Sequence, residues 1–168
     1  PATDLLAVLK TVGEDPERRP AAESWADLLM ERLRKERDTE HGVALTEMRA
    51  GWLAGVKSDS DIRAFCDRIL GDLFSREPVG RNFAAGAGFR DGGDVSACFR
   101  RFRLLMRLQP GAFCVHPSWG PGTVKRLDDF YAKVVIDFAG RPNHEMGYAF
   151  ASESLELPGD DHLLAMAQ

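Results

Sequence analysis

The sequence has few cysteines and no long apolar run, and each shortage excludes a class of protein. Three cysteines among 168 residues are an odd number without a Cys-x-x-Cys pair, so neither a disulfide framework nor a thiolate zinc site is predicted. No apolar stretch approaches the roughly 20 residues that span a bilayer, and the first residues lack a secretion signal. We therefore expect a cytoplasmic protein that stays out of the membrane, with Cys66, Cys98 and Cys114 buried.

Charge is unevenly distributed along the chain, whose formal net charge is −4. Residues 94–109 carry four arginines against one aspartate, whereas residues 110–168 carry eight acidic and four basic side chains. Because nucleic-acid binding draws most of its affinity from neutralised phosphates, the acidic C-terminal part is poorly suited to bind DNA or RNA by itself. A protein partner is the favoured interpretation there, with nucleic acid bound weakly or indirectly.

The first 109 residues show the three- and four-residue spacing of amphipathic helices. Helices are predicted over residues 4–12, 21–37, 43–56, 61–74 and 95–108. In the second of them Trp25, Leu28, Leu29 and Leu33 form one stripe, which we expect to be buried. Gly13 stands where the C-terminal cap of the first helix belongs, and residues 58–60 are predicted to supply hydroxyl and carboxylate caps for the fourth helix.

Residues 76–93 show no periodicity and contain Pro78 and five glycines, which predicts a long loop. Phe83 and Phe89 within it are expected to pack back onto the helices. Next, Asp94 is predicted to cap the helix over residues 95–108.

Three arginines of that last helix recur at steps of three and four residues, namely Arg100, Arg103 and Arg107. Such a row is a candidate phosphate-binding face. The alternative is a solvated face that exchanges ion pairs with the acidic remainder of the chain.

After residue 109 the period changes from helical to strand-like. Strands are predicted over residues 112–116, 123–127, 132–138 and 144–149, with a glycine-punctuated turn over 117–122 and one helical turn over 151–155. Short strands at such spacing are typical of a small barrel. We therefore predict an α+β chain with an all-α helical domain over 1–109, a small SH3-like or Tudor-like β-barrel over 110–158, and the start of a C-terminal helix over 159–168.

The predicted strands carry a motif made of Gly111, Val115-His116, Trp119-Gly120-Pro121-Gly122-Thr123-Val124, Val135-Ile136-Asp137-Phe138, His144-Glu145-Met146, Leu155 and Asp161-His162. This motif resembles the Tudor-like barrels of bacterial transcription proteins: the polymerase-interacting domains of CarD and of the transcription-repair coupling factor, and the C-terminal barrel of UvrD/PcrA-type helicases. A helical segment leading into such a barrel is similar to the N-terminal region of long-form GreA-type transcription elongation and cleavage factors. Because the sequence starts with Pro1 and an apolar helical pattern begins over residues 162–166, the chain is expected to be a piece of a longer protein.

The resemblance implies a docking module and not an enzyme. In such barrels an edge strand pairs with an edge strand of the β subunit of RNA polymerase, which is the expected partner. The acidic-tipped coiled coil with which Gre factors promote cleavage has no counterpart in the heptad pattern of this chain, so no activity, cofactor or metal is expected. The residues that the resemblance makes candidates for partner binding are Trp119, Val115, His116, Val135, Phe138 and Tyr131.

Several alternatives remain at the level of sequence. Gly120 and Gly122 permit the positive backbone angles of a tight turn, so Trp119 is either an anchor at the barrel rim or a plug in its end. A nucleic-acid-binding module would use the arginine row, with Trp119 or Tyr131 as stacking platforms. An architectural spacer is the third option.

A metal site is not predicted either. The helical spacing of a zinc pair is absent among His116, His144, His162 and Cys114.

Overall fold

The computed structural model describes residues 1–159 and shows an α+β chain, with a helical N-terminal region and a small C-terminal β domain. The chain divides into two compact units, Pro1–Glu77 and Pro78–Gln168. No helix among the described residues is long and apolar enough to cross a membrane. The predicted helix start over residues 159–168 lies outside the described residues apart from its first position.

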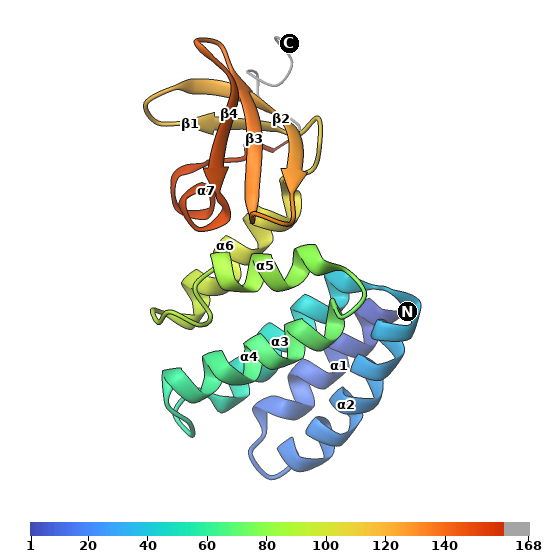
Figure 1. Cartoon of the computed structure of the whole chain (residues 1–168). Helices are drawn as coiled ribbons and strands as arrows, with labels where there is room; N and C mark the ends of the chain where they lie inside the picture. The colour runs from blue at the N-terminus through green and yellow to red at the C-terminus, as the bar shows by residue number, and fades with distance from the viewer. Residues whose placement is uncertain (160–168) are drawn as a thin grey trace. The chain divides into compact units, whose positions relative to one another are not determined.

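The first unit consists of four helices that follow one another along the chain (Figure 1). Their bounds are Ala2–Glu14 for α1, Arg19–Glu36 for α2, Thr39–Leu53 for α3 and Asp59–Leu73 for α4. The predicted cap of α4 is confirmed, because the Ser58 hydroxyl accepts a hydrogen bond from the Asp61 amide at 3.1 Å. The four predicted helices are present, with ends that differ by one to four residues.

Gly13 lies inside α1, so its predicted role as a C-terminal cap is wrong. A Cβ at this position would overlap the indole ring of Trp52 in α3. Glycine is therefore required by the close approach of two helices and not by a turn.

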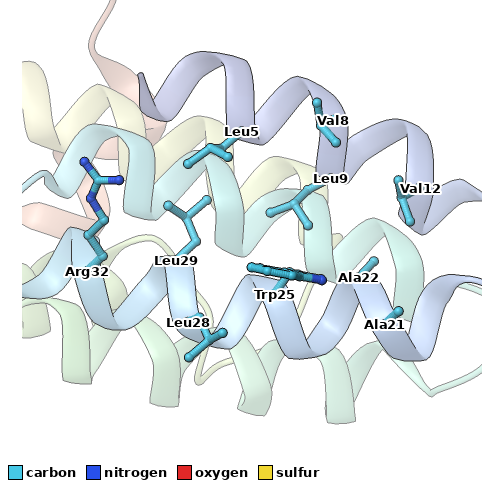
Figure 2. Close-up of a pocket in the computed structure, with 10 residues that line it drawn as sticks. All are labelled: Leu5, Val8, Leu9, Val12, Ala21, Ala22, Trp25, Leu28, Leu29 and Arg32. Atoms are coloured by element: carbon cyan, nitrogen blue, oxygen red, sulfur yellow. The ribbon is translucent and has the colours of Figure 1, made fainter.

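The apolar stripe of α2 is only partly buried. Leu29 and Leu33 are buried as predicted, but Trp25 is 66% exposed and Leu28 is 60% exposed. Both exposed side chains line a groove between α1 and α2 (Figure 2). The prediction that the whole stripe is buried is therefore wrong, because the apolar face of α2 is wider than the surface that α1 and α3 cover.

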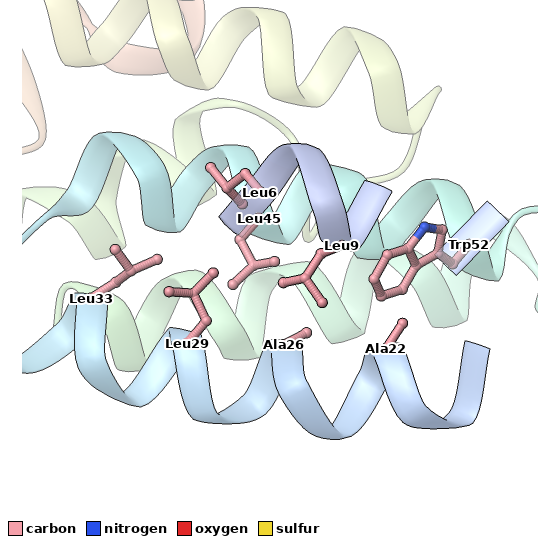
Figure 3. Packing of buried hydrophobic residues seen from close by; sticks show 8 residues of the cluster. All are labelled: Leu6, Leu9, Ala22, Ala26, Leu29, Leu33, Leu45 and Trp52. Carbon is pink, nitrogen blue, oxygen red and sulfur yellow. The ribbon is translucent and has the colours of Figure 1, made fainter. Parts of the chain in front are cut away.

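The core of the first unit lies where α1, α2 and α3 meet (Figure 3). It is built from small and large side chains that interleave, namely Leu6, Leu9, Ala22, Ala26, Leu29, Leu33, Leu45 and Trp52. Ala22 and Ala26 are fully buried. Their small side chains let the backbone of α2 approach its neighbours closely.

The second unit begins with α5, Pro78–Gly86, in the segment that was predicted to be a loop. That prediction is wrong because tertiary packing outweighs the local preference of glycine and proline. Phe83 contacts Tyr148 edge to face with ring centroids 5.0 Å apart, and Phe89 contacts Phe99 in the same way at 5.1 Å. Both phenylalanines are buried, as predicted.

Helix α6, Val95–Arg107, is capped by the Asp94 carboxylate, which accepts from the Ala97 amide at 3.0 Å. Strands β1 Phe113–His116, β2 Gly120–Asp128, β3 Lys133–Phe138 and β4 Arg141–Gly147 then form an antiparallel sheet in the order β1-β2-β3-β4. The four predicted strands are therefore present. The fourth ends earlier than predicted, because Tyr148 and Ala149 already belong to helix α7, Tyr148–Ser154.

Helix α7 joins the sheet to the two preceding helices, since it contacts α5, α6, β3 and β4. The Ser152 hydroxyl donates to the Gly86 carbonyl at 3.2 Å, and the Tyr148 hydroxyl donates to an Asp129 carboxylate oxygen at 3.1 Å. The two compact units consequently divide at residues 77 and 78, whereas the change of period had placed the boundary after residue 109. Packing, not period, determines which unit α5 and α6 belong to.

Cys66 in the first unit and Cys98 and Cys114 in the second are thiols and are completely buried, as expected. Burial raises the pKa of the Cys114 thiol to about 11.

Candidate docking surface of the β domain

The turn between β1 and β2 holds Trp119 at one end of the sheet. Gly120 follows with φ of 75°, a left-handed conformation that favours glycine, as the sequence predicted. Gly122 has a different role from the predicted one, since it shows no positive φ. A Cβ on Gly122 would lie 2.6 Å from the Phe138 ring, so glycine is needed where β2 crosses that side chain.

Six side chains from the turns, strands and helix α7 surround this position, and we call them the Trp119 cluster: His116, Trp119, Phe138, Arg141, His144 and Phe150. The His116 ring stacks on the Trp119 indole with centroids 3.8 Å apart and planes at 12°. The Arg141 guanidinium carbon lies 4.9 Å from the Trp119 ring centroid. Trp119 is half-buried, so it both packs against the sheet and reaches solvent.

His116 has the most constrained environment in the Trp119 cluster, with 6% of its surface exposed. Its Nδ1 accepts a hydrogen bond from the Ser118 amide at 3.1 Å, which places the proton of the neutral ring on Nε2. Nε2 is buried without a hydrogen-bond partner. Burial lowers the pKa of His116, and the positive charges of His144 and Arg141 lower it further.

Arg141 and Phe150 complete the Trp119 cluster at the surface. Arg141 is exposed, and no carboxylate of the described residues lies within ion-pair distance of it. Phe150, on α7, is 51% exposed and lies 6.5 Å from Trp119 between ring centroids. Together they form an aromatic surface with an unneutralised positive charge.

The two edges of the sheet differ in what occupies them. At the β1 edge the Val115 amide donates to the Glu156 carbonyl at 2.8 Å, and the Glu156 amide donates to the Val115 carbonyl at 3.0 Å. Within residues 1–159, β4 pairs with β3 and with no other strand. Pro142 lies in β4, and proline in a sheet is typical of an edge strand. The open edge is therefore that of β4, which begins at Arg141.

Tyr131 lies at the opposite end of the sheet from Trp119. It belongs to the β2–β3 connection and contacts Phe130 edge to face at 4.8 Å, and both rings are exposed. The Tyr131 amide is held by an Asp128 carboxylate oxygen at 3.1 Å. In an antiparallel meander the first and third turns share one end and the second turn lies at the other, so the predicted docking residues divide between two ends.

The remaining candidate docking residues are buried or half-buried in the β domain. Val135 and Phe138 are buried, and Val115 is half-buried with its backbone engaged by Glu156. Trp119 and His116 are therefore the predicted residues that the structure brings together with Phe138. Arg141, His144 and Phe150 of the Trp119 cluster were not among the predicted docking residues. Arg141 could have been predicted, because it follows the third turn of the meander and that turn lies at the same end of the sheet as the first turn, which holds Trp119.

The three arginines of α6, Arg100, Arg103 and Arg107, are all exposed on one helix. Arg107 also donates to the Pro158 carbonyl at 3.5 Å. Their arrangement suits a diffuse positive face more than a shaped pocket.

Ser118, His116 and His144 make contacts that the structure describes. The Ser118 amide, not its hydroxyl, contacts His116, so the nearby serine and histidine do not form a nucleophile–base pair. Within residues 1–159, no three or more His, Cys, Asp or Glu side chains are grouped to hold a metal ion. Of the histidines considered for a metal, His116 and His144 both contact Trp119, and His162 lies outside the described residues.

Comparison with known proteins gives one partial likeness. No protein-family model matches the chain, and no solved structure matches it. The transcription elongation factor GreA of Chlamydia trachomatis serovar D is 35% identical over 80 residues. The matched stretch covers 46% of this chain and 11% of that protein. Over less than half of its length, the chain is thus similar to a small part of a transcription elongation factor.

Proposed function

We propose that this chain is a non-catalytic docking module of the transcription machinery, and that its β domain binds the β subunit of bacterial RNA polymerase. The likeness to a transcription elongation factor supports the general setting. The observation that supports this docking surface is that the open edge strand, β4, begins at Arg141, which belongs to the Trp119 cluster.

An open edge strand offers a partner unpaired backbone groups. An extended segment that adds to β4 would form main-chain hydrogen bonds, which supply affinity largely independent of the partner's side chains. Specificity would then come from side chains next to the edge. Tryptophan and arginine are the residue types that dominate binding energy at protein interfaces, and Trp119 and Arg141 lie together where β4 begins.

The positive charge of the Trp119 cluster favours a partner segment that carries a negative charge. No carboxylate of the described residues forms an ion pair with Arg141, which lies over the Trp119 indole. A carboxylate from the partner next to Arg141 would neutralise this charge in a partly desolvated place. An extended segment with an acidic side chain fits this surface.

The test is binding of the 168-residue chain to purified bacterial RNA polymerase core enzyme, measured by biolayer interferometry at 50 and 300 mM salt. We expect binding at both salt concentrations. Arg141→Glu should weaken binding about tenfold or more, in line with the usual cost of losing a central interface residue. Absence of binding at both salt concentrations would contradict the proposal.

A matched control separates the two ends of the sheet. Phe150→Ala removes an exposed ring of the Trp119 cluster, whereas Phe130→Ala removes an exposed ring at the opposite end. Only the first should weaken polymerase binding. Equal effects would mean that the Trp119 cluster is not the docking surface, and a selective effect of Phe130→Ala would move the surface to the end that holds Tyr131.

The second candidate function is nucleic-acid binding by the arginine row, which the common exposure of Arg100, Arg103 and Arg107 supports. Its signature is salt dependence, because a protein with 6–10 phosphate contacts loses roughly 10³- to 10⁵-fold in affinity between 50 and 200 mM salt. Strand addition is far less sensitive. Binding of single-stranded DNA at low salt alone, with no binding of polymerase, would favour this second function.

A further inference from the structure

Helix α2 ends at an arginine whose backbone conformation is unfavourable for that residue type. Arg37 has φ of 58° and ψ of 31°, in the left-handed region. The Asp38 amide donates to the Leu33 carbonyl at 2.9 Å, which is the hydrogen bond of a Schellman motif. Glycine is the usual residue at the left-handed position of that motif. Residues held in such conformations gather at ligand-binding sites, so the Arg37 guanidinium is a candidate ligand-binding group.

The Arg37 side chain lines a hollow of about 260 Å³ in the first unit, which we call the Arg37 hollow. Three segments meet there and supply its polar lining, namely Arg34, Lys35 and Arg37 from the end of α2, Thr39 from the start of α3, and Ser75, Arg76 and Glu77 from the segment after α4. The lining thus combines four cations and two hydroxyl groups with one carboxylate. Guanidinium groups and hydroxyls are the groups that bind phosphate and carboxylate oxygens.

Most of the positive charge of the Arg37 hollow is unpaired. Lys35 forms an ion pair with Glu31 at 2.8 Å between Nζ and Oε1. Arg34 acts on the same carboxylate only at longer range, without an ion pair. The side chains of Arg34, Arg37 and Arg76 are all exposed, and none of them has a hydrogen bond or ion pair with a described residue. Three guanidinium groups are therefore available to a ligand.

The acidic side chains around the Arg37 hollow do not remove this excess. Asp38 is engaged by His41, whose Nδ1 lies 2.7 Å from Oδ2 of the carboxylate. Asp72 lies with Arg34 in an adjacent hollow and forms no ion pair with it. Glu77 is the carboxylate of the lining itself, so three unpaired arginines face one acidic group. Because like charges repel one another, a bound anion would stabilise this arrangement.

We propose that the Arg37 hollow binds the phosphate group of a small molecule. Once the Lys35–Glu31 pair is set aside, the lining carries an excess of two positive charges. A phosphate monoester carries a charge of roughly −1.5 to −2 at neutral pH, which matches that excess. Arginine binds two phosphate oxygens at once through its planar fork, and the hydroxyls of Thr39 and Ser75 are donors for the remaining oxygens.

The lining of the Arg37 hollow favours a compact anion over a nucleic-acid strand. No aromatic side chain is among the residues that line it, so a base finds no ring on which to stack. A strand also requires a groove that follows several phosphates, whereas this hollow has the size for one phosphate group and a short carrier. The site belongs to the first unit and shares no residue with the proposed docking surface, so neither proposal depends on the other.

The test is a two-dimensional NMR titration of the 168-residue chain with inorganic phosphate and, separately, with pyrophosphate. Sodium chloride of equal ionic strength is the reference. We expect the amide signals of residues 34–39 and 73–77 to shift saturably with phosphate or pyrophosphate and not with chloride. A chain that shows no saturable shift with either anion up to about 20 mM, which corresponds to a very weak free energy of binding, would overturn the proposal.

Arg37 permits a variant that separates binding from folding. Arg37→Gly removes the guanidinium and introduces the residue type that favours a positive φ. We expect the affinity for phosphate to fall about tenfold or more, with a melting temperature that is unchanged or higher in the absence of phosphate. Arg76→Gln should weaken binding in the same way. Lys57→Gln is the control, because Lys57 is an exposed cation of the same unit that does not line the hollow.

Two results with these variants would contradict a phosphate site in the Arg37 hollow. One is an affinity that Arg37→Gly and Arg76→Gln leave unchanged, and the other is an equal loss in Lys57→Gln, which would indicate a general effect of charge. A single-stranded oligonucleotide is the last probe. If it shifts the amides of residues 34–39 and 73–77 while phosphate and pyrophosphate do not, the hollow is part of a nucleic-acid surface and the proposal is wrong.

Discussion

His116 couples the stability of the β domain to pH, because its ring is buried with one nitrogen unpartnered and its pKa is lowered. In the unfolded chain its pKa returns to about 6.5. As pH falls below that value the unfolded state takes up a proton that the folded state does not yet accept, so the free energy of unfolding decreases. At pH 7.5 the titration of His116 therefore does not lower the free energy of unfolding. As the pH falls below about 6.5, it lowers that free energy increasingly.

The measurement is urea unfolding at pH 7.5 and pH 5.5 for the native chain and for His116→Phe. We expect the drop in stability between the two pH values to be smaller in the variant, since phenylalanine keeps the stacked ring but binds no proton. Equal drops in both proteins would show that His116 is not responsible.

Gly13 offers a prediction about packing in the first unit. Gly13→Ala should destabilise it by about 1–3 kcal/mol, because the added methyl overlaps the Trp52 indole and overpacking carries costs of that order. Gly51, in α3, has no atom within 4 Å of the corresponding position, so Gly51→Ala should stabilise by roughly 0.5–1 kcal/mol. In thermal unfolding, Gly13→Ala should lower the melting temperature and Gly51→Ala should raise it. A higher melting temperature in both variants would contradict the close approach of α1 to the Trp52 indole.

Single residues also show where sequence reasoning succeeded and failed. The caps at Ser58 and Asp94 are local devices, and both were predicted because the side chain and the amide that it accepts from are three residues apart. Gly13 and Trp25 were misinterpreted. Their environments depend on which helices lie opposite, which no local pattern contains.

At the scale of elements, the bridge between β1 and Glu156 gives a clear prediction. Glu156→Pro removes the amide that donates to the Val115 carbonyl, and we expect a loss of about 1 kcal/mol or more in the free energy of unfolding. Glu156→Ala keeps both backbone hydrogen bonds and should be nearly neutral. Chemical unfolding of both variants is the measurement, and equal stability of the two proteins would mean that the bridge contributes little.

The elements themselves were predicted unequally. The strands were found because β-branched and aromatic residues are separated by glycine turns, and that signal is local. Helix α5 was missed because its glycines and proline oppose helix formation, whereas the burial of Phe83 against Tyr148 favours it. The Trp119 cluster was predicted only in part. Trp119 is recognisable from its place in a glycine turn, which is a local signal. Phe150 contacts Trp119 from α7, and no local pattern predicts that these two segments meet.

At the scale of the whole molecule, the position of the boundary decides which fragments fold. Residues 1–77 and residues 78–168 should each unfold cooperatively when produced alone. Residues 110–168 should not, because they lack the helices whose Phe83 packs on Tyr148 and whose Gly86 carbonyl receives the Ser152 hydroxyl. Circular dichroism melts of the three fragments are the measurement. A fragment 110–168 that melts at the temperature of 78–168 would restore the boundary after residue 109.

The buried thiols have a consequence for kinetics. A thiol reagent reaches a fully buried sulfur only when the structure around it opens, so its rate of reaction reports the free energy of that opening. Cys66 reports on the first unit, while Cys98 and Cys114 report on the second, and no cysteine has to be introduced. The raised pKa of Cys114 matters less once the unit opens, because an exposed thiol returns to its ordinary acidity. Labelling rates followed by mass spectrometry would therefore rank the two units by how often each opens, in one intact chain and without a mutation.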